Sequence, residues 1–376
     1  MARDGAVLHT PNAKEAKPGN TVFLTIDSRL QKVANESLAK AIQSSGQPDC
    51  IAGGVVALSV KDFSVLAAAT YPSYDLAKLT EPGYYSQLAN DKANPLFNRA
   101  FQGAFAPGSI FKPLVACGAL EEGVLTTEDK IKCVGIYHYP GHNFTTKCLG
   151  VHGNADLNYA MAKSCNVYFS EAGRRLGIEN MNLYAKRFGL GVKTGIELTE
   201  TTGILAGPEY SRSIGSRWSN LVTIKAAIGQ SDNQFSPLQL ATYVATIANG
   251  GNRYRPHLIR KITDYRRENI VMENNPDSPE LVETAGVSEE HLNMVKTAMR
   301  QVVLSGTATN FNGYMVPVAA KTGTAQNNGS DHTTFICFAP YENPEIAIAV
   351  VVEHGAKGMV SKIVAKDIMD AYFSNK

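Results

Sequence analysis

The stretch VPVAAKTGTAQ, residues 316–326, indicates how this chain folds. Apolar and small residues lead into a Lys-Thr-Gly triplet at Lys321, Thr322 and Gly323. Two further apolar segments, TTFICFA and EIAIAVVVE, follow directly and are typical of a β-hairpin. We therefore expect the triplet to lie on, or at the end of, a strand beside that hairpin.

Strand patterns also occur near the other end of the chain. NTVFLTID, residues 20–27, predicts a strand, and residues 52–72 predict two strands joined by a Lys-Asp turn. Between about residues 94 and 249 the pattern becomes helical and loop-rich. The remaining expected elements are a helix at 28–43, a strand at 255–264, a polar loop at 266–287, a helix at 288–304 and a closing helix at 361–372.

These elements predict an α+β fold with one mostly antiparallel central sheet packed with helices, plus a large helical subdomain. We expect residues 1–20 to be a leader or linker and residues 21–376 to form one domain. Its sheet pieces would lie at about 21–93 and 250–376, on either side of a helical insert at about 94–249.

The composition is that of an ordinary globular protein with a sizeable core. Of the 376 residues, 44% are hydrophobic and 19% are charged. A net charge of +2 argues against a nucleic-acid partner, which requires a concentrated basic stripe. The longest apolar run, at 346–352, has the length of a strand and not of a membrane span.

A Ser-x-x-Lys motif supplies a candidate nucleophile and base. Serine needs a neighbouring base to attack, and residues three apart share one face of a helix. Ser109 follows a Pro-Gly turn that would start a helix, and the apolar surroundings of Lys112 favour a neutral amine. A second copy, Ser37 with Lys40, lies inside an earlier helix, and we expect a solvated helix face there.

The Lys-Thr-Gly triplet also occurs twice. Lys321 precedes the hairpin, where the small Gly323 would let a substrate backbone approach closely. Lys193 follows FGLG and has the pattern of a connection after a helix. We therefore predict that the copy at Lys321 is functional and that the copy at Lys193 is structural.

A Ser-x-Asn motif presents the same choice. Ser164 and Asn166 follow a helical run, and would stand at a helix-loop junction. Ser231 and Asn233 match the Ser-Asp-Asn form more closely, but their setting is a loop ahead of a helix. Ser164 is also nearer to Ser109 in the chain, and we favour Ser164 and Asn166.

With these three motifs in order, the chain resembles the penicillin-binding proteins and their serine β-lactamase relatives. The resemblance covers roughly residues 20–373 and is specific to the transpeptidase domain of class B penicillin-binding proteins. The stretches that carry it include GNTVFLTIDSRLQKVANESL, LAAATYPSYDL, NRAFQGAFAPGSIFKP, GLGVKTGIEL and GQSDNQFSPLQLATYVATIANGG.

The resemblance implies a role for each catalytic residue. Ser109 would be the acylated nucleophile, and Lys112 would be the base that takes its proton. Ser164 would pass a proton to the departing amine, and Asn166 would hold Lys112 and the substrate amide. Lys321 would supply positive charge near Ser164.

The third motif would also bind substrate. By the same resemblance, Thr322 and Thr324 would bind the terminal carboxylate of the substrate, beside Gly323. The backbone amides of Ser109 and Thr324 would form the oxyanion hole.

The implied reaction is acyl transfer that crosslinks peptidoglycan stem peptides, with β-lactam antibiotics as mimics of the donor. Class B members carry an N-terminal membrane anchor and a pedestal module, which this sequence does not contain. We therefore expect the domain to lie on the extracytoplasmic face of the bacterial membrane, with an anchor before residue 1 and a separate glycosyltransferase partner in the membrane.

Three of the six cysteines, Cys50, Cys117 and Cys337, lie in apolar segments and are expected in the core. The other three group with a histidine, as Cys133, Cys148, His152 and Cys165. This set would suit tetrahedral zinc, but its spacing fits a Cys133–Cys148 disulfide equally well.

The resemblance favours zinc, because some class B proteins have a metal site here with a cysteine ligand inside the second motif. Such a metal would be structural, would tie residues 133–152 to the second motif and would not touch substrate. His138 and His142 are alternatives for one ligand.

Three other activities share these motifs. A class A β-lactamase needs a water-activating Glu-x-x-x-Asn, and neither Glu197 nor Glu200 has an Asn at that offset. A β-lactam sensor domain would not need the long segment between Ser164 and Lys321. A D,D-carboxypeptidase differs only in its acceptor, so the motifs leave it open.

Overall fold

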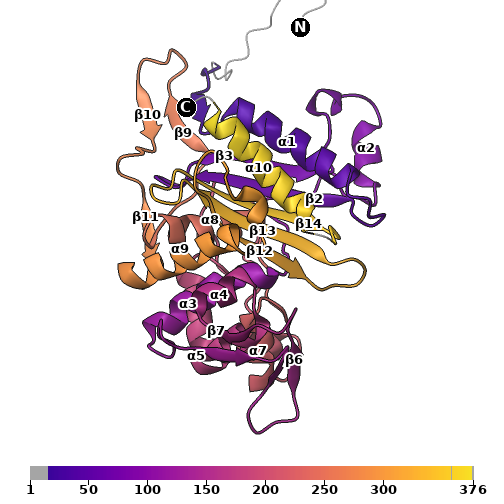
Figure 1. Cartoon of the computed structure of the whole chain (residues 1–376). Coiled ribbons are helices and arrows are strands. Elements are labelled where there is room, and N and C mark those ends of the chain that lie inside the picture. Colours follow the sequence, from indigo (N-terminus) through magenta and orange to yellow (C-terminus); the bar gives the residue numbers. More distant parts are fainter. Residues whose placement is uncertain (1–15, 357, 375–376) are drawn as a thin grey trace, which may run out of the picture.

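A five-stranded antiparallel sheet is the centre of the computed structural model, which describes residues 16–356 and 358–374 (Figure 1). Ser59 pairs with Ile346, so the two ends of the chain meet in the middle of this sheet. Its strands, in spatial order, are β12 (Ala319–Ala325), β13 (His332–Ala339), β14 (Ile346–Glu353), β2 (Ala52–Ser59) and β3 (Val65–Tyr71). The α+β fold is therefore confirmed.

Helices cover both faces of this sheet. Helices α1 (Ser28–Gln43) and α10 (Met359–Phe373) lie side by side on one face (Figure 1). Helix α8 (Pro237–Ala248) packs on β2, β13 and β14, and all of its residues are buried. Helix α9 (Glu289–Leu304) packs against β12. The sheet is buried on both sides, which explains the nearly continuous apolar runs of its strands.

The expected solvated face around Ser37 is wrong. Ser37 is buried, and its hydroxyl donates a 2.7 Å hydrogen bond to the Asp367 carboxylate of α10. The residue lies on the side of α1 that packs on α10, so it helps to join the two helices.

The expectation of one sheet from all the terminal strands is also wrong. Strand β1 (Thr21–Leu24) pairs with β9 (Ile259–Thr263), which in turn pairs with β10 (Ile270–Glu273) in a separate sheet. Alternate side chains of β1 are exposed, whereas the central sheet is covered on both faces. The predicted polar loop at 266–287 contains β10 and also β11 (Leu281–Thr284), which pairs with β8 (Asn252–Tyr254).

The segment between the sheet pieces is mainly helical. Two short hairpin-like pairs within it, β4 with β7 and β5 with β6, were not predicted, because strands of three residues have no clear periodicity. Its elements are η1 (Leu76–Lys78), α2 (Tyr84–Ala89), η2 (Gly108–Phe111), α3 (Lys112–Glu121), β4 (Ile131–Cys133), β5 (Ile136–His138), β6 (Thr145–Lys147), β7 (Gly153–Ala155), α4 (Leu157–Ala162), α5 (Asn166–Arg187), α6 (Pro208–Ser213) and α7 (Asn220–Ala227); η3 (Thr309–Phe311) follows α9.

The N-terminal leader predicted for residues 1–20 falls largely outside the described residues, which start at residue 16. Across the part of the chain that the structure describes, none of the helices combines the length and the apolarity that a bilayer crossing requires.

Candidate active site

Ser109 lies on a short 3-10 turn that leads directly into a helix, as the sequence predicts. The turn is η2, and Lys112 is the first residue of α3, followed by Pro113 in the first helical turn. Ser109 is half-buried and lines a cavity of about 580 Å³. The nucleophile candidate is therefore accessible, while the helix that follows it is buried from Lys112 to Leu120.

The turn is held by close backbone contacts. The amide of Gly108 donates a 2.9 Å hydrogen bond to the carbonyl of Gly229. Gly108 has a φ of 58°, and a Cβ atom at this position would lie 2.4 Å from the carbonyl oxygen of Thr324. Only glycine fits here, and its absence of a side chain brings the Ser109 turn against β12.

The amine of Lys112 is surrounded by acceptors of the second motif. Its Nζ atom donates to the Ser164 carbonyl at 2.7 Å, the Ser164 hydroxyl at 3.1 Å and Asn166 Oδ1 at 2.8 Å. Lys112 is fully buried, and burial lowers its pKa to about 7. A substantial fraction of this amine is therefore neutral near pH 7, as a base requires.

Ser164 stands between the two lysines. It lies at the junction of α4 and α5 with a φ of 54°, a conformation that few residues other than glycine adopt. The buried Lys321 donates to its hydroxyl at 3.0 Å, close to the 3.1 Å contact from Lys112. Burial, together with the nearby charge of Lys112, holds the pKa of Lys321 well below its usual range. All three sequence motifs therefore meet at one hydroxyl.

The strand β12 presents the other residues of the third motif to the cavity. The Thr322 hydroxyl lies 2.6 Å from that of Thr307, and Gln230 donates to the Thr324 carbonyl at 3.3 Å. The structure shows a different reason for glycine at position 323 than the approach of a substrate backbone. A Cβ atom there would lie 2.1 Å from the Thr334 hydroxyl and 2.8 Å from the Pro107 carbonyl, so the chain itself requires glycine.

The cavity has further lining residues that sequence reasoning did not identify. They come from loops, helix ends and the three-residue strand β6, where no periodicity or motif marks them. Gln230 was within a quoted stretch, GQSDNQF, but that stretch suggested no role. The additional residues are Thr146, Lys147, Leu149, Ile228, Gln230, Thr307, Gln326, Asp331, Gly358 and Lys362.

The duplicate motifs have structural contacts elsewhere. The amides of Thr194 and Gly195 donate to the Glu200 carboxylate, and Glu197 accepts hydrogen bonds from the backbone of β9 and the residue before it. The buried Asn233 side chain bridges two backbone segments. None of these residues is among those that line the cavity. The two glutamates are therefore not placed to activate water there.

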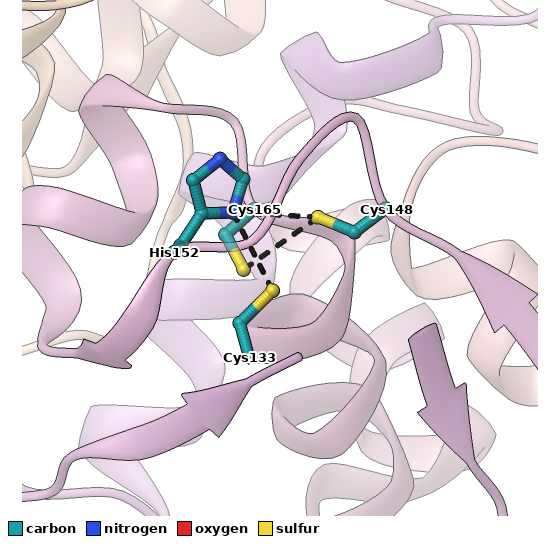
Figure 2. Close-up of side chains that lie close together, drawn as sticks. All are labelled: Cys133, Cys148, His152 and Cys165. Carbon is teal, nitrogen blue, oxygen red and sulfur yellow. Dashed lines mark hydrogen bonds between the residues drawn. The ribbon is translucent and has the colours of Figure 1, made fainter. Parts of the chain in front are cut away.

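Cys133, Cys148, His152 and Cys165 point toward one another beside the active site (Figure 2). Cys133 ends β4, Cys148 and His152 lie between β6 and β7, and Cys165 caps α5. Their ligand atoms all lie within 4.8 Å of one another. His138 and His142 are not members of the group, and Cys50, Cys117 and Cys337 are buried as expected.

The distances in this cluster fit a tetrahedral metal site. Zinc at about 2.3 Å from sulfur and about 2.0 Å from nitrogen would separate two sulfurs by about 3.8 Å, and sulfur from nitrogen by about 3.5 Å. Cys148 and Cys165 Sγ are 3.8 Å apart, and His152 Nδ1 lies 3.5 Å from Sγ of both Cys133 and Cys148. The alternative of a Cys133–Cys148 disulfide is wrong, because both cysteines are free.

Two sulfurs of the cluster differ in acidity, because the pKa of Cys148 is lowered while contact with Cys148 and burial raise the pKa of Cys165. The Cys165 thiol and nearby backbone amides donate to the Cys148 sulfur, and they lower the pKa of Cys148 to about 3. The amide of Asn166 is one of these donors, at 3.2 Å, and the Asn166 side chain donates to the Lys147 carbonyl at 3.0 Å. The cluster therefore contacts the same residue that holds Lys112.

Comparison with known proteins agrees with this geometry. Residues 53–370 match the family described as Penicillin binding protein transpeptidase domain. Peptidoglycan D,D-transpeptidase MrdA of Acinetobacter baumannii is 33% identical over an alignment of 388 positions, which covers 97% of this chain. The chain spans 55% of the length of that relative.

Two solved structures are similar throughout the fold. Penicillin-binding protein A from M. tuberculosis, as its penicillin G acyl-enzyme complex, has a TM-score of 0.80 and 26% identity, covering 94% of this chain and 81% of that chain. A chain from a peptidoglycan synthase complex that coordinates polymerization and crosslinking has a TM-score of 0.83 and 29% identity, covering 97% of this chain and 64% of that one. From the family match and the shared fold, the chain belongs to the penicillin-binding protein transpeptidase domain family.

Proposed function

We propose that this chain is the catalytic domain of a serine D,D-transpeptidase, which crosslinks peptidoglycan stem peptides through an acyl-enzyme on Ser109. The observation that carries the proposal is the shared contact of Lys112 and Lys321 with the Ser164 hydroxyl, beneath the cavity that Ser109 lines. This arrangement provides a nucleophile, a base of suitable pKa and a route for a proton to the leaving group.

In the first half-reaction, the Ser109 hydroxyl attacks the carbonyl carbon of the D-Ala-D-Ala bond. Lys112 takes the serine proton as the new C–O bond forms, because a substantial fraction of its buried amine is neutral near pH 7. The C–N bond then breaks, and D-alanine leaves after its nitrogen receives a proton. Ser164 passes on that proton, since its hydroxyl touches the amines of both lysines.

In the second half-reaction, the amine of a neighbouring stem peptide attacks the ester. The new C–N bond replaces the C–O bond, and Ser109 regains its proton from the same lysine and serine groups. The backbone amides of Ser109 and Thr324 are our candidates for the oxyanion hole. Support for this pair comes from the close approach of the Gly108 backbone to Thr324.

Thr322 and Thr324 are our candidates for binding the terminal carboxylate of the donor. Both line the cavity on the strand that also carries Lys321. The same residues would hold the carboxylate of a β-lactam, whose acylation of Ser109 would stop after the first half-reaction. The family description and the acyl-enzyme of the M. tuberculosis relative support this part of the proposal.

We further propose that Cys133, Cys148, His152 and Cys165 hold a structural zinc ion. Three sulfurs and one imidazole nitrogen are a donor set that zinc prefers, and the Cys133–His152, Cys148–His152 and Cys148–Cys165 separations match a tetrahedral site. When bound, the metal would supply a rigid cross-link and no catalytic group. The residues themselves position Asn166, and through it Lys112, by backbone and side-chain hydrogen bonds.

The biological setting follows from the relatives and is also a proposal. A glycosyltransferase partner would polymerise the glycan strands that this domain crosslinks, as in the synthase complex that contains a similar chain. The whole protein would be anchored in the cell membrane, with this domain on its outer face, where peptidoglycan is assembled.

Intact-mass measurement with penicillin G tests the proposal. We expect a single covalent adduct that persists for hours on the wild-type domain and is absent from Ser109→Ala. An adduct that disappears quickly while the drug is consumed would instead indicate a β-lactamase. A peptide ending in D-Ala-D-Ala, with and without an acceptor amine, distinguishes the other alternative. Crosslinked product supports a transpeptidase, and release of D-alanine to water alone indicates a D,D-carboxypeptidase.

A further inference from the structure

Lys362 places a cation at the edge of the active-site cavity, on an element that the three motifs do not include. It lies in the first turn of α10, is half-buried and lines the same cavity as Ser109. Its Nζ atom donates a 3.3 Å hydrogen bond to the carbonyl of Thr307. The ammonium group therefore makes one long hydrogen bond near the protein surface. Its other N–H groups can donate to a ligand in the cavity.

Thr307 connects Lys362 to the third motif. The Thr307 hydroxyl lies 2.6 Å from the Thr322 hydroxyl, while its carbonyl accepts from Lys362. Thr322, Thr324 and Lys362 therefore line the same cavity, and Thr307 links Lys362 to Thr322. A hydroxyl pair beside an ammonium is a suitable arrangement for a carboxylate.

The other lysines of the site are poorly placed to attract an anion. Lys112 and Lys321 are fully buried, each already donates to protein oxygens, and burial lowers the pKa of both. Among the described residues that line the cavity, the lysines are Lys147 and Lys362. Lys147 is on β6, on the side of Asn166, whose side chain donates to its carbonyl.

The position of Lys362 is unfavourable for the fold by itself. A cation in the first turn of a helix opposes the positive end of the helix dipole, and α10 has no acidic residue in that turn. Burial also lowers the pKa of Lys362. An anion bound in the cavity would offset both effects. The position of Lys362 therefore favours a role in ligand binding over a role in stabilising the fold.

We propose that Lys362 is a positioning residue for the terminal carboxylate of the donor stem peptide, and for the matching carboxylate of a β-lactam. It supplies the full positive charge, while Thr322 and Thr324 supply the hydroxyl groups. The inference rests on the proposed transpeptidase function. It adds a residue from the C-terminal helix to the donor subsite.

The test compares Lys362→Met with the wild type, using penicillin G and its methyl ester, which lacks the negative charge. We expect the second-order rate of acylation by penicillin G to fall about ten- to a hundredfold, the range for losing a hydrogen bond to a charged group. Most of this decrease should come from weaker binding of penicillin G before acylation. The limiting rate of acylation at saturating penicillin G should change less. The rate with the ester should be unchanged, and Lys362→Arg should keep most of the wild-type rate.

Lys366→Met is the matched control, because Lys366 lies one turn further along α10, outside the cavity lining, and pairs with Asp370. It should acylate at the wild-type rate with both compounds. Equal slowing of penicillin G and its ester in Lys362→Met would overturn the proposal in favour of a structural role, and an unchanged rate would also overturn it. No acylation of the wild type by penicillin G would instead count against the proposed function itself.

Discussion

The backbone amide of Asn166 donates a 3.2 Å hydrogen bond to the sulfur of Cys148, which joins the proposed metal cluster to the residue that holds Lys112, the proposed base. The Asn166 side chain makes the remaining links, accepting from Lys112 at 2.8 Å and donating to the Lys147 carbonyl at 3.0 Å. A change in the structure of the cluster should therefore alter the position of Lys112, although no cluster residue lines the cavity.

Removal of the proposed zinc ion should weaken the hydrogen bonds that link Cys148 to Lys112 through Asn166. We expect about one zinc ion per chain by elemental analysis. A strong chelator should lower the melting temperature and slow penicillin acylation by about tenfold or more, because outer contacts of metal ligands act at this scale. Added zinc should restore both. Cys117→Ala, which removes a buried cysteine outside the cluster, should keep its zinc. Equal acylation rates with and without chelator would contradict the positioning role.

The acylation rate should depend on pH through Lys112. Its pKa is lowered to about 7 by burial, against a raising effect of the nearby Cys165 and Cys148 side chains. A protonated amine cannot accept the serine proton, so the rate should fall as the pH drops below about 7 and should level off above it. Stopped-flow acylation between pH 5 and 9 measures this. A rate that stays flat down to pH 5 would exclude Lys112 as the base.

Asn166→Asp should move that pH profile upward. The new carboxylate would lie beside the Lys112 ammonium, and an adjacent opposite charge raises the pKa of an amine. We expect a shift of about one to two pH units, with little change in the rate at high pH. Asn35→Asp, at an exposed position of α1, adds the same charge away from the site and should leave the profile unchanged. An unshifted profile for Asn166→Asp would argue against direct contact with the base.

Gly229→Ala should destabilise the turn that carries Ser109. A Cβ atom at this position would lie 1.9 Å from the carbonyl oxygen of Gly108, and the φ of Gly229 is 74°. Strain and overpacking together should cost about 2 kcal/mol or more, together with a loss of acylation. Gly215→Ala, with a φ of 71° and open space around it, isolates the conformational part of the cost. Denaturant unfolding of both variants gives the difference.

The motifs predicted the centre of the site because their chemistry is local. Ser109 and Lys112 share a helical turn, Ser164 and Asn166 share a junction, and a strand carries Lys321. Thr307 and Lys362 were missed, since only tertiary packing brings the end of α9 and the start of α10 to β12. The spacing of residues in the sequence does not indicate which distant segments pack against one another.

The errors in the fold have a similar origin. Ser37 is polar and lies among good helix formers. Its neighbours in the sequence therefore do not indicate that it is buried and bonded to Asp367 of a distant helix. Strand β1 was correctly recognised as a strand, but its partner could not be chosen from its own residues. The central sheet was predictable because its strands are apolar on both faces, which marks them as buried whatever their order.

The pairing of Ser59 with Ile346 has a consequence for how the enzyme is made. Strand β2 leaves the ribosome well before its neighbour β14, because most of the described chain lies between them. Lys321 also lies far beyond Ser109 in the sequence, so a growing chain has its serine long before it has a complete proton route. Contacts between such distant segments also form slowly. Catalytic competence should therefore appear only after β14 has emerged and paired with β2, and a truncation within β14 should abolish it while leaving Ser109 intact.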